Sequence, residues 1–301
     1  MLHKARTKSE ELKILEYLDS RMNLEEGDKN HLIALNKGYE GEVLFDKLTA
    51  GLTSQGIVLN DLRFKVKNTN VQIDTTIIFQ KTLKFYEVKN HEGDYYFSED
   101  KYFSWNGTEW ANPLHQMRRE ETFYRLLLDE IGCNLKLEPS LLFINPAFTM
   151  YNAPFNEPII YPTQLQRHMD MLNNVSSNLT SHHWSIADKL LSRHIEKSDF
   201  IQLPSYNFKT TRKGFTCAKC KNFSVYLIGR KILVCSLCTH EEGIEAAVLR
   251  SVEEIKLLFP DLPIGTGVVQ QWCVILSTKV IKAILDKHFR AICNNRWTYY
   301  I

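Results

Sequence analysis

Short apolar runs separated by polar turns follow one another along the first half of the chain. Residues 57–64, 71–79 and 83–89 are rich in β-branched and aromatic side chains, a composition typical of β-strands. Residues 95–97 and 101–105 are strongly aromatic and predict a further hairpin, and the Asn-Gly dipeptide that follows them favours a two-residue turn. The pattern therefore predicts a group of strands in this part of the chain.

Helical spacing of apolar residues occurs on both sides of these strands. In these segments an apolar residue recurs every three or four positions, which gives a helix one apolar face. The predicted helices cover residues 9–22, 38–48, 113–128, 163–191 with a break near 176–178, 241–259, 266–276 and 277–293. The end of the chain is therefore predicted to be a helical region.

Charged residues occupy defined positions on two of the predicted strands. Glu87 and Lys89 are two residues apart, so their side chains project from the same face of a strand. If Asp74 pairs with Glu87 in a regular antiparallel hairpin, Ile78 pairs with Leu83 and the two carboxylates share that face. The expected register therefore places Ile78 opposite Leu83.

An acid followed by Glu-x-Lys on the next strand is an arrangement that many metal-dependent nucleases use. Two carboxylates can bind a hard cation such as Mg²⁺, which prefers oxygen ligands and keeps several waters. The cation would stabilise charge on a phosphate and generate a hydroxide nucleophile, which Lys89 would orient or help to deprotonate. The alternative is that these charges lie on the solvated face of a hairpin, because short motifs give many false positives.

Two glycines precede an acid in the predicted helix 38–48. Gly38 and Gly41 each cost about 1 kcal/mol relative to alanine inside a helix, so their presence within one turn suggests a close approach of the backbone. We expect this approach to let Glu42 reach the sheet. A frayed helix N-terminus is the alternative.

The next long helix begins with residues that suit a helix N-terminus. Asn112 is a suitable N-cap, and Pro113 occupies the first helical position. Gln116 lies in the first turn and is followed by Arg118 and Arg119. This combination would suit a phosphate, although solvated surface charges are the commoner explanation.

The motifs described so far occur in a defined order: Gly38-x-x-Gly41-Glu42, Ile73-Asp74, Glu87-Val88-Lys89 and Asn112-Pro113-x-x-Gln116. Together they resemble the nuclease-related domain (NERD), a member of the PD-(D/E)XK nuclease-like superfamily, over about residues 37–150. The resemblance implies an α/β fold of the restriction-endonuclease type, with a mixed sheet flanked by helices. It also implies a Mg²⁺ site with Glu42, Asp74 and Glu87 as metal-binding acids, Lys89 as the catalytic lysine and Gln116 as an accessory polar residue. The superfamily has a proline before the aspartate, where this chain has Ile73.

Four cysteines in the last third of the chain predict a second site. Two Cys-x-x-Cys pairs, separated by residues 221–234, match the spacing of a tetrahedral zinc site. Residues 223–234 predict two strands around Gly229-Arg230, the hairpin that a zinc ribbon requires. Four thiolates leave no open coordination position, so Zn²⁺ would be structural, whereas paired disulfides or a redox dithiol are the alternatives. The expected ligands are Cys217, Cys220, Cys235 and Cys238.

Composition limits the remaining possibilities. A chain of 301 residues, 44% hydrophobic and 24% charged, is ordinary for a globular protein of about two domains. The net charge of +2 does not demand a nucleic-acid partner, so such binding would need local patches. We find no secretory signal and no apolar run long enough to cross a membrane, which predicts a cytoplasmic protein without a membrane partner.

We divide the chain into five segments, with the prolines at 154, 158 and 162 marking the exit from the second. The segments are an N-terminal helical extension (1–36), a nuclease-related domain (37–150), a helical connector (151–209), a zinc ribbon (210–240) and a helical C-terminal region (241–301).

The favoured function is metal-dependent hydrolysis of phosphodiester bonds in DNA, with the ribbon and the C-terminal helices binding the substrate or a partner protein. The alternative is a non-catalytic module that keeps the nuclease-like fold for nucleic-acid binding or protein docking. The intact set of acids favours the enzyme, because clustered carboxylates repel phosphates. The last predicted helix carries a basic surface that would bind phosphates or only cap the ribbon; it consists of Lys279, Lys282, Lys287 and Arg290.

Overall fold

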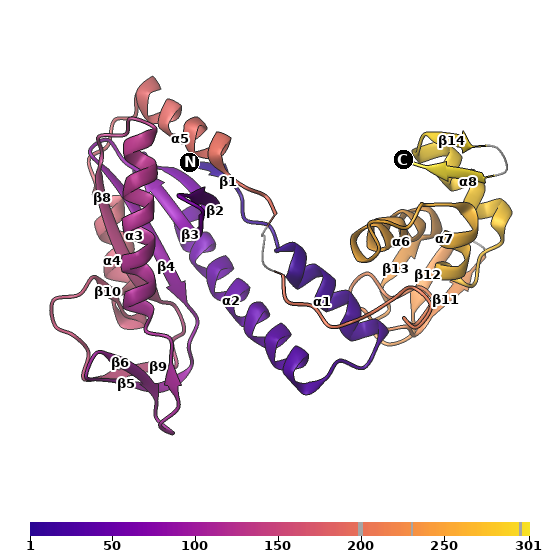
Figure 1. The fold of residues 1–301 in the computed structure, drawn as a ribbon, viewed down its shortest axis with the longest axis horizontal. Helices are drawn as coiled ribbons and strands as arrows, with labels where there is room; N and C mark the ends of the chain where they lie inside the picture. Colours follow the sequence, from indigo (N-terminus) through magenta and orange to yellow (C-terminus); the bar gives the residue numbers. More distant parts are fainter. Residues whose placement is uncertain (198–200, 230, 295–296) are drawn as a thin grey trace. The chain divides into compact units, whose positions relative to one another are not determined.

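The computed structural model describes residues 1–197, 201–229, 231–294 and 297–301. The chain forms two compact units, each built from segments that are distant in sequence (Figure 1). No helix in these described ranges is both long and apolar enough to span a membrane. The first unit contains Met1–Lys8 and Ile33–Phe200, and the second contains Ser9–Leu32 and Ile201–Ile301.

Within the described part of the chain, a mixed sheet of six strands forms the centre of the first unit. In spatial order the strands are β1 (Leu2–Lys4), β2 (Ile57–Val66), β3 (Thr69–Ile78), β4 (Thr82–Lys89), β8 (Lys136–Phe143) and β10 (Ile159–Ile160). The pairs β2–β3 and β3–β4 are antiparallel, whereas β1–β2, β4–β8 and β8–β10 are parallel. Most residues of β2, β3 and β4 are buried, which explains their nearly continuous apolar sequence.

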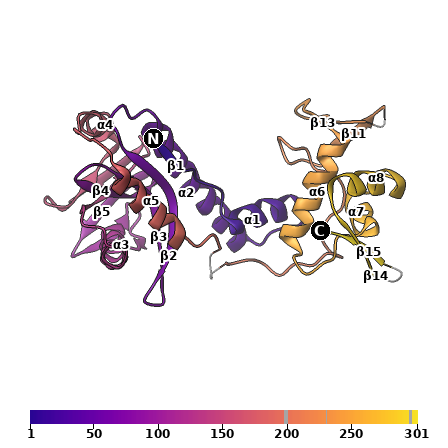
Figure 2. The ribbon, with the colours of Figure 1, turned by 90° about the horizontal axis from the view of Figure 1, so that it is seen from above.

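Helices cover both faces of this sheet and confirm the expected α/β class. The helices on one face are α3 (Pro113–Glu130) and α5 (Ser181–Arg193), and those on the other are α2 (Glu26–Ala50) and α4 (Leu165–Asn173), which follows the 3-10 turn η1 (Pro162–Gln164). Figure 2 shows α2 and α3 on opposite sides of the strands. The start of α3 is as predicted, because the Asn112 side chain accepts a hydrogen bond from the Leu114 N–H.

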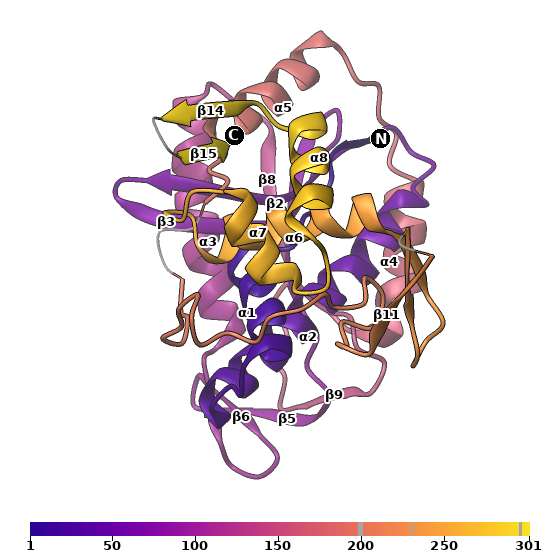
Figure 3. The ribbon, with the colours of Figure 1, turned by 90° about the vertical axis from the view of Figure 1, so that its right-hand side faces the viewer.

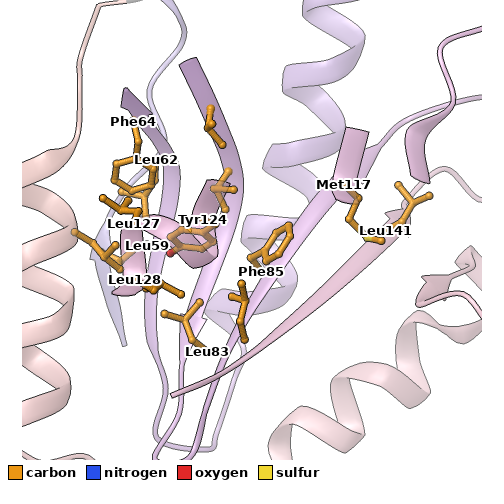
Figure 4. Close-up of a cluster of buried hydrophobic side chains, with 14 of the residues drawn as sticks. Leu59, Leu62, Phe64, Leu83, Phe85, Met117, Tyr124, Leu127, Leu128 and Leu141 are labelled. Atoms are coloured by element: carbon orange, nitrogen blue, oxygen red, sulfur yellow. The ribbon is translucent and has the colours of Figure 1, made fainter. Parts of the chain in front are cut away.

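The larger hydrophobic core of the first unit lies between the sheet and α3 (Figure 4). The ring of Tyr124 stacks on Phe64 and meets Phe85 edge-on, with centroid distances of 5.8 Å in both cases. Its hydroxyl bonds to Thr76 Oγ1 on β3 at 2.9 Å. Burying a large apolar side chain stabilises a fold by about 1.5–3 kcal/mol, so these contacts fix α3 over β3 and β4. The first turns of α3 are thereby held near the ends of these strands.

A smaller sheet in the first unit contains the predicted aromatic hairpin. Its strands, in spatial order, are β7 (Glu109–Trp110), β6 (Lys101–Ser104), β5 (Gly93–Ser98) and β9 (Phe148–Tyr151). Gly107 has a φ of +83° in the turn between β6 and β7, as the Asn-Gly signal predicts. Tyr95 and Tyr102 are buried and stacked with centroids 5.1 Å apart, so both serve packing.

The second unit combines an N-terminal helix with the last third of the chain (Figure 3). Its elements are α1 (Glu10–Arg21), the sheet of β11 (Val225–Ile228), β12 (Ile232–Cys235) and β13 (Glu241–Gly243), the helices α6 (Ile244–Leu258), α7 (Thr266–Cys273) and α8 (Thr278–His288), and the hairpin of β14 (Ala291–Asn294) and β15 (Trp297–Tyr300). The guanidinium of Arg21 anchors α1, because it donates to both Glu254 oxygens at 2.6 and 2.8 Å and lies 4.1 Å from the Trp272 ring centroid.

The last predicted helix is shorter than expected, and a hairpin follows it. The prediction of one helix over 277–293 is wrong after His288, because β14 pairs antiparallel with β15. Tyr300 is buried; its N–H donates to the Ile264 carbonyl at 2.8 Å and its hydroxyl to Asp286 Oδ1 at 2.7 Å. These long-range contacts favour a strand, and helical periodicity carries no information about them.

Candidate functional site

The pairing of β3 with β4 brings two acids together. Ile78 pairs with Leu83, which confirms the predicted register, and the same register continued places Asp74 opposite Glu87. The Val88 N–H donates to Asp74 Oδ2 at 2.8 Å. Both acids are buried, with exposed fractions of 6% for Asp74 and 3% for Glu87.

The ladder between β2 and β3 is interrupted beside Asp74. The pairs on either side of the interruption keep one register, but Asp61, which lies opposite Asp74, has a φ of +51° in the left-handed region. At this break the Asp74 carbonyl accepts a hydrogen bond from Arg6 Nη2 at 2.7 Å. The irregular backbone therefore gives an N-terminal arginine access to the site.

Arg6 connects this part of the sheet to α2. Its side chain is 2% exposed and donates to Glu42 Oε2 at 2.5 Å. It also donates to both oxygens of Asp46, at 3.0 and 3.1 Å. Paired, charge-assisted hydrogen bonds of this kind fix geometry strongly. Glu42 is thus held beside the strand that carries Asp74.

Gly41 explains why α2 can approach the sheet so closely. A Cβ at this position would lie 2.5 Å from Asn90 Cβ and 3.2 Å from Ile144 Cγ2. The Asn90 Nδ2 donates to the Lys37 carbonyl at 2.8 Å and so ties the end of β4 to α2. At Gly38, by contrast, a Cβ would meet nothing within 4 Å in the described ranges. The expected close approach is confirmed for Gly41 only, and the frayed-terminus alternative is wrong because both glycines lie inside α2.

Lys89 and Gln116 meet where the first turns of α3 lie near the end of β4. Lys89 Nζ lies 2.5 Å from Glu87 Oε1 and donates to Gln116 Oε1 at 2.8 Å. Gln116 Nε2 in turn donates to Glu120 Oε1 at 2.9 Å. The structure thus links Glu87, Lys89 and Gln116 in one hydrogen-bonded chain, with Asp74 on the adjacent strand, and it adds Glu120 to this group.

Burial and mutual repulsion raise the pKa values of the acids in this cluster. Burial, together with the charges of Glu87 and Glu42, holds the pKa of Asp74 well above its usual value. Burial also raises the pKa of Glu42. Burial and the neighbouring Glu87 raise the pKa of Glu120 to about 10. Perturbed pKa values cluster at functional sites, where burial and like charges shift them, and this makes the group a candidate site.

Lys89 keeps its charge in this environment. Burial alone would lower its pKa, but the charge and hydrogen bond of Glu87 and the charge of Asp74 raise the pKa overall. The ammonium group therefore stays available as a hydrogen-bond donor and a positive charge.

The donor set suits a hard divalent cation. Carboxylate oxygens are the ligands that Mg²⁺ prefers, and one buried oxygen of Glu120 has no hydrogen-bond partner among the described residues. Two of the acids form ion pairs with basic side chains, Glu42 with Arg6 and Glu87 with Lys89. In the described part of the chain, only the ribbon cysteines form a group of three or more candidate ligands whose ligand atoms all lie within 4.8 Å of one another. Three of the carboxylates therefore do not converge this closely in this structure.

The two arginines near the start of α3 lie on the surface of the protein. Arg118 is half-exposed and forms an ion pair with Glu157, and Arg119 is exposed. Their exposure agrees better with the alternative of solvated surface charges than with a phosphate site.

The four cysteines form the second site. Cys217 Sγ lies 3.5 Å from Cys238 Sγ, Cys220 Sγ lies 3.6 Å from Cys235 Sγ, and all four are free thiols. A tetrahedral zinc ion bound at about 2.3 Å separates its sulfurs by about 3.8 Å, whereas a disulfide needs about 2.05 Å. The predicted hairpin between the pairs is present as β11 and β12. The cluster can therefore bind zinc.

Sequence patterns did not identify two residues of the first site. Arg6 is 68 positions from Asp74, and no local motif marks it. Glu120 is four positions after Gln116 and four before the core residue Tyr124, which places it on the buried face of α3. An acid on the apolar face of an amphipathic helix is the signal that would have revealed Glu120.

Comparison with known proteins finds a family match that covers most of the first site. The chain matches no curated protein and no solved structure. One family model matches, that of the nuclease-related domain, and the match covers residues 37–144. This range includes the whole of the first site except Arg6. Residues 37–144 therefore form a nuclease-related domain of the NERD family.

Proposed function

We propose that this protein is a divalent-cation-dependent nuclease that hydrolyses phosphodiester bonds, with DNA as its substrate. The observation that carries the proposal is the buried group of Asp74, Glu87 and Lys89 on paired strands of a nuclease-related domain. A module that only binds nucleic acid gains nothing from buried acids next to its ligand, because they repel phosphates.

Each residue of the group has a role in this proposal. Asp74 and Glu87 would bind Mg²⁺ through carboxylate oxygens, and Glu42 would contact the ion or a water between them. A bound Mg²⁺ supplies charge stabilisation for the phosphate and lowers the pKa of a bound water. Lys89 is held protonated by Glu87, so it orients the attacking water and stabilises negative charge rather than removing a proton. Gln116 fixes the position of Lys89.

The test is Mg²⁺-dependent cleavage of labelled single- and double-stranded DNA and RNA. Asp74→Asn and Glu87→Gln should abolish turnover, because both remove charge from the cation site while preserving side-chain size. Lys89→Ala should slow hydrolysis by about 10²- to 10³-fold, the usual scale for losing one positioned donor that stabilises transition-state charge. All three variants should still bind nucleic acid.

Glu121→Gln is the matched control, because Glu121 lies on the solvated side of α3 and pairs with Arg125. Its activity should equal that of the unmodified protein. Equal cleavage by every variant would assign the activity to a contaminant. No cleavage of any substrate with any divalent metal would favour a non-catalytic nucleic-acid-binding or protein-docking module.

We also propose that Zn²⁺ at Cys217, Cys220, Cys235 and Cys238 is structural. Four thiolates fill a tetrahedral shell and leave no position for a substrate. The ribbon and the C-terminal helices would then bind nucleic acid or a partner protein. Free thiols suit the reducing cytoplasm, where we expect the protein to act.

A further inference from the structure

Glu120 lies beside the candidate cation site, although no sequence motif marks it. It is on α3, one helical turn after Gln116, whose Nε2 donates to Glu120 Oε1 at 2.9 Å. The side chain also faces Glu87, and the residue is only 8% exposed. Because the core contacts of Tyr124 fix α3 against β3, Glu120 is held in this place.

The second carboxylate oxygen of Glu120 is unsatisfied. Among the described residues, Oε2 is the one buried acidic oxygen without a hydrogen-bond partner. Leaving a buried polar atom unpaired costs about 1–3 kcal/mol, and more for a charged group. Folded proteins rarely tolerate this cost unless a ligand, ion or water completes the atom's contacts.

Charge identifies the class of ligand that would complete them. Asp74, Glu87 and Glu120 are three buried acids, and Lys89 is the basic side chain that bonds within this group. Arg6 contributes little here, because it reaches Asp74 through the backbone carbonyl while its charge pairs with Glu42 and Asp46. An oxygen-seeking divalent cation would favour the ionised forms of these carboxyl groups and would take their oxygens as ligands.

We propose that Glu120 is a further acid of the divalent-cation site and acts together with Asp74 and Glu87. The inference rests on the proposed function and extends it, because it assigns α3 a direct part in cation binding. In this arrangement Gln116 links Lys89 to Glu120, so one hydrogen-bonded chain joins the positioned lysine to a metal-binding acid.

The test is calorimetric titration of Glu120→Gln with Mn²⁺ and Mg²⁺, without substrate. The amide oxygen can still accept the hydrogen bond from Gln116, so the substitution mainly removes the ability of this side chain to ionise and bind a cation. Affinity for the cation should fall about 10- to 100-fold, and the rise in melting temperature caused by Mn²⁺ should shrink. Glu120→Asp keeps the charge but shortens its reach, and it should also weaken binding. Glu121→Gln should bind like the unmodified protein.

The comparison with Asp74→Asn separates the two proposals. If Glu120→Gln and Glu120→Asp bind the cation like the unmodified protein while Asp74→Asn does not, the role of Glu120 is refuted and the proposed function stands. If the unmodified protein itself binds neither Mn²⁺ nor Mg²⁺, both are refuted.

Discussion

At the scale of single residues, the absence of a side chain at Gly41 determines how closely α2 can approach the end of β4. Around this glycine, α2 lies so close to the end of β4 that any Cβ would overlap Asn90. Glu42 is the next residue, so the spacing between helix and strand decides where its carboxylate lies. Arg6 then holds that carboxylate in place. Residues with no chemical role of their own can therefore set the geometry of the acids.

Gly41→Ala should destabilise the protein by about 1–3 kcal/mol, because the neighbouring backbone must shift to admit the methyl group. Gly38→Ala is the matched control in the same helix. It should raise the free energy of unfolding by up to about 1 kcal/mol, since alanine is the better helix former and meets no described neighbour. Urea unfolding of both variants measures the difference. Equal stabilities would contradict the close approach at Gly41.

Sequence patterns predicted the positions of those site residues whose placement depends on neighbouring residues in the chain. Strand alternation and loop length were sufficient to place Asp74, Glu87 and Lys89 on paired strands. They were insufficient for Arg6, because its partners belong to other elements. The same holds for His183 on α5, which is buried and whose Nε2 lies 3.0 Å from the Gln80 carbonyl oxygen. Tertiary contacts of this kind leave no periodic trace in the sequence.

At the scale of elements, the length of a strand determines whether a sequence pattern can predict it. The long strands β2, β3 and β4 were predictable because their apolar runs span many residues. By contrast, β1 and β10 span only Leu2–Lys4 and Ile159–Ile160, and they are strands because neighbouring strands pair with them. The zinc ribbon lies between these cases, since cysteine spacing identifies it although its strands are short.

The ribbon should depend on its metal. Tyr226, Ile228 and Ile232 on its strands are exposed, so the ribbon has little core of its own. Cys217→Ser and Cys238→Ser should therefore lower zinc content and open residues 210–240 to protease, because metal binding and local folding are coupled.

Zinc analysis and limited proteolysis measure both effects in the ribbon variants. Cys133→Ala, in the core of the first unit, should retain zinc and serves as the control. Freshly purified, reduced protein without zinc would refute the metal site.

At the scale of the whole molecule, a net charge of +2 conceals an uneven surface. Lys279 and Lys282 on α8 are exposed and line one pocket, together with Thr278. Lys287 on the same helix is instead paired with Glu245 at 2.8 Å. The basic face predicted for this helix thus contains lysines in different electrostatic environments.

Replacing both Lys279 and Lys282 by glutamine should weaken DNA binding and flatten its salt dependence. Each lost phosphate contact reduces the slope of log affinity against log salt by about 0.9. Lys287→Gln should change the slope less, because Glu245 already neutralises that lysine. Binding isotherms at several salt concentrations measure the slopes. A double variant with the slope of the unmodified protein would mean that α8 only caps the ribbon.

The chain passes between its two units more than once, and this affects whether either unit can be separated or transplanted. The chain leaves the first unit after Lys8, re-enters it at Ile33 and leaves it again after Phe200. A single backbone cut between the units cannot separate them, because two other connections remain. Transplanting residues 37–144 into another protein would likewise leave Arg6 behind, and the acid that this arginine holds would lose its counter-charge. A segment that carries this complete site into another protein, in evolution or in the laboratory, must therefore include Arg6 as well as residues 37–144.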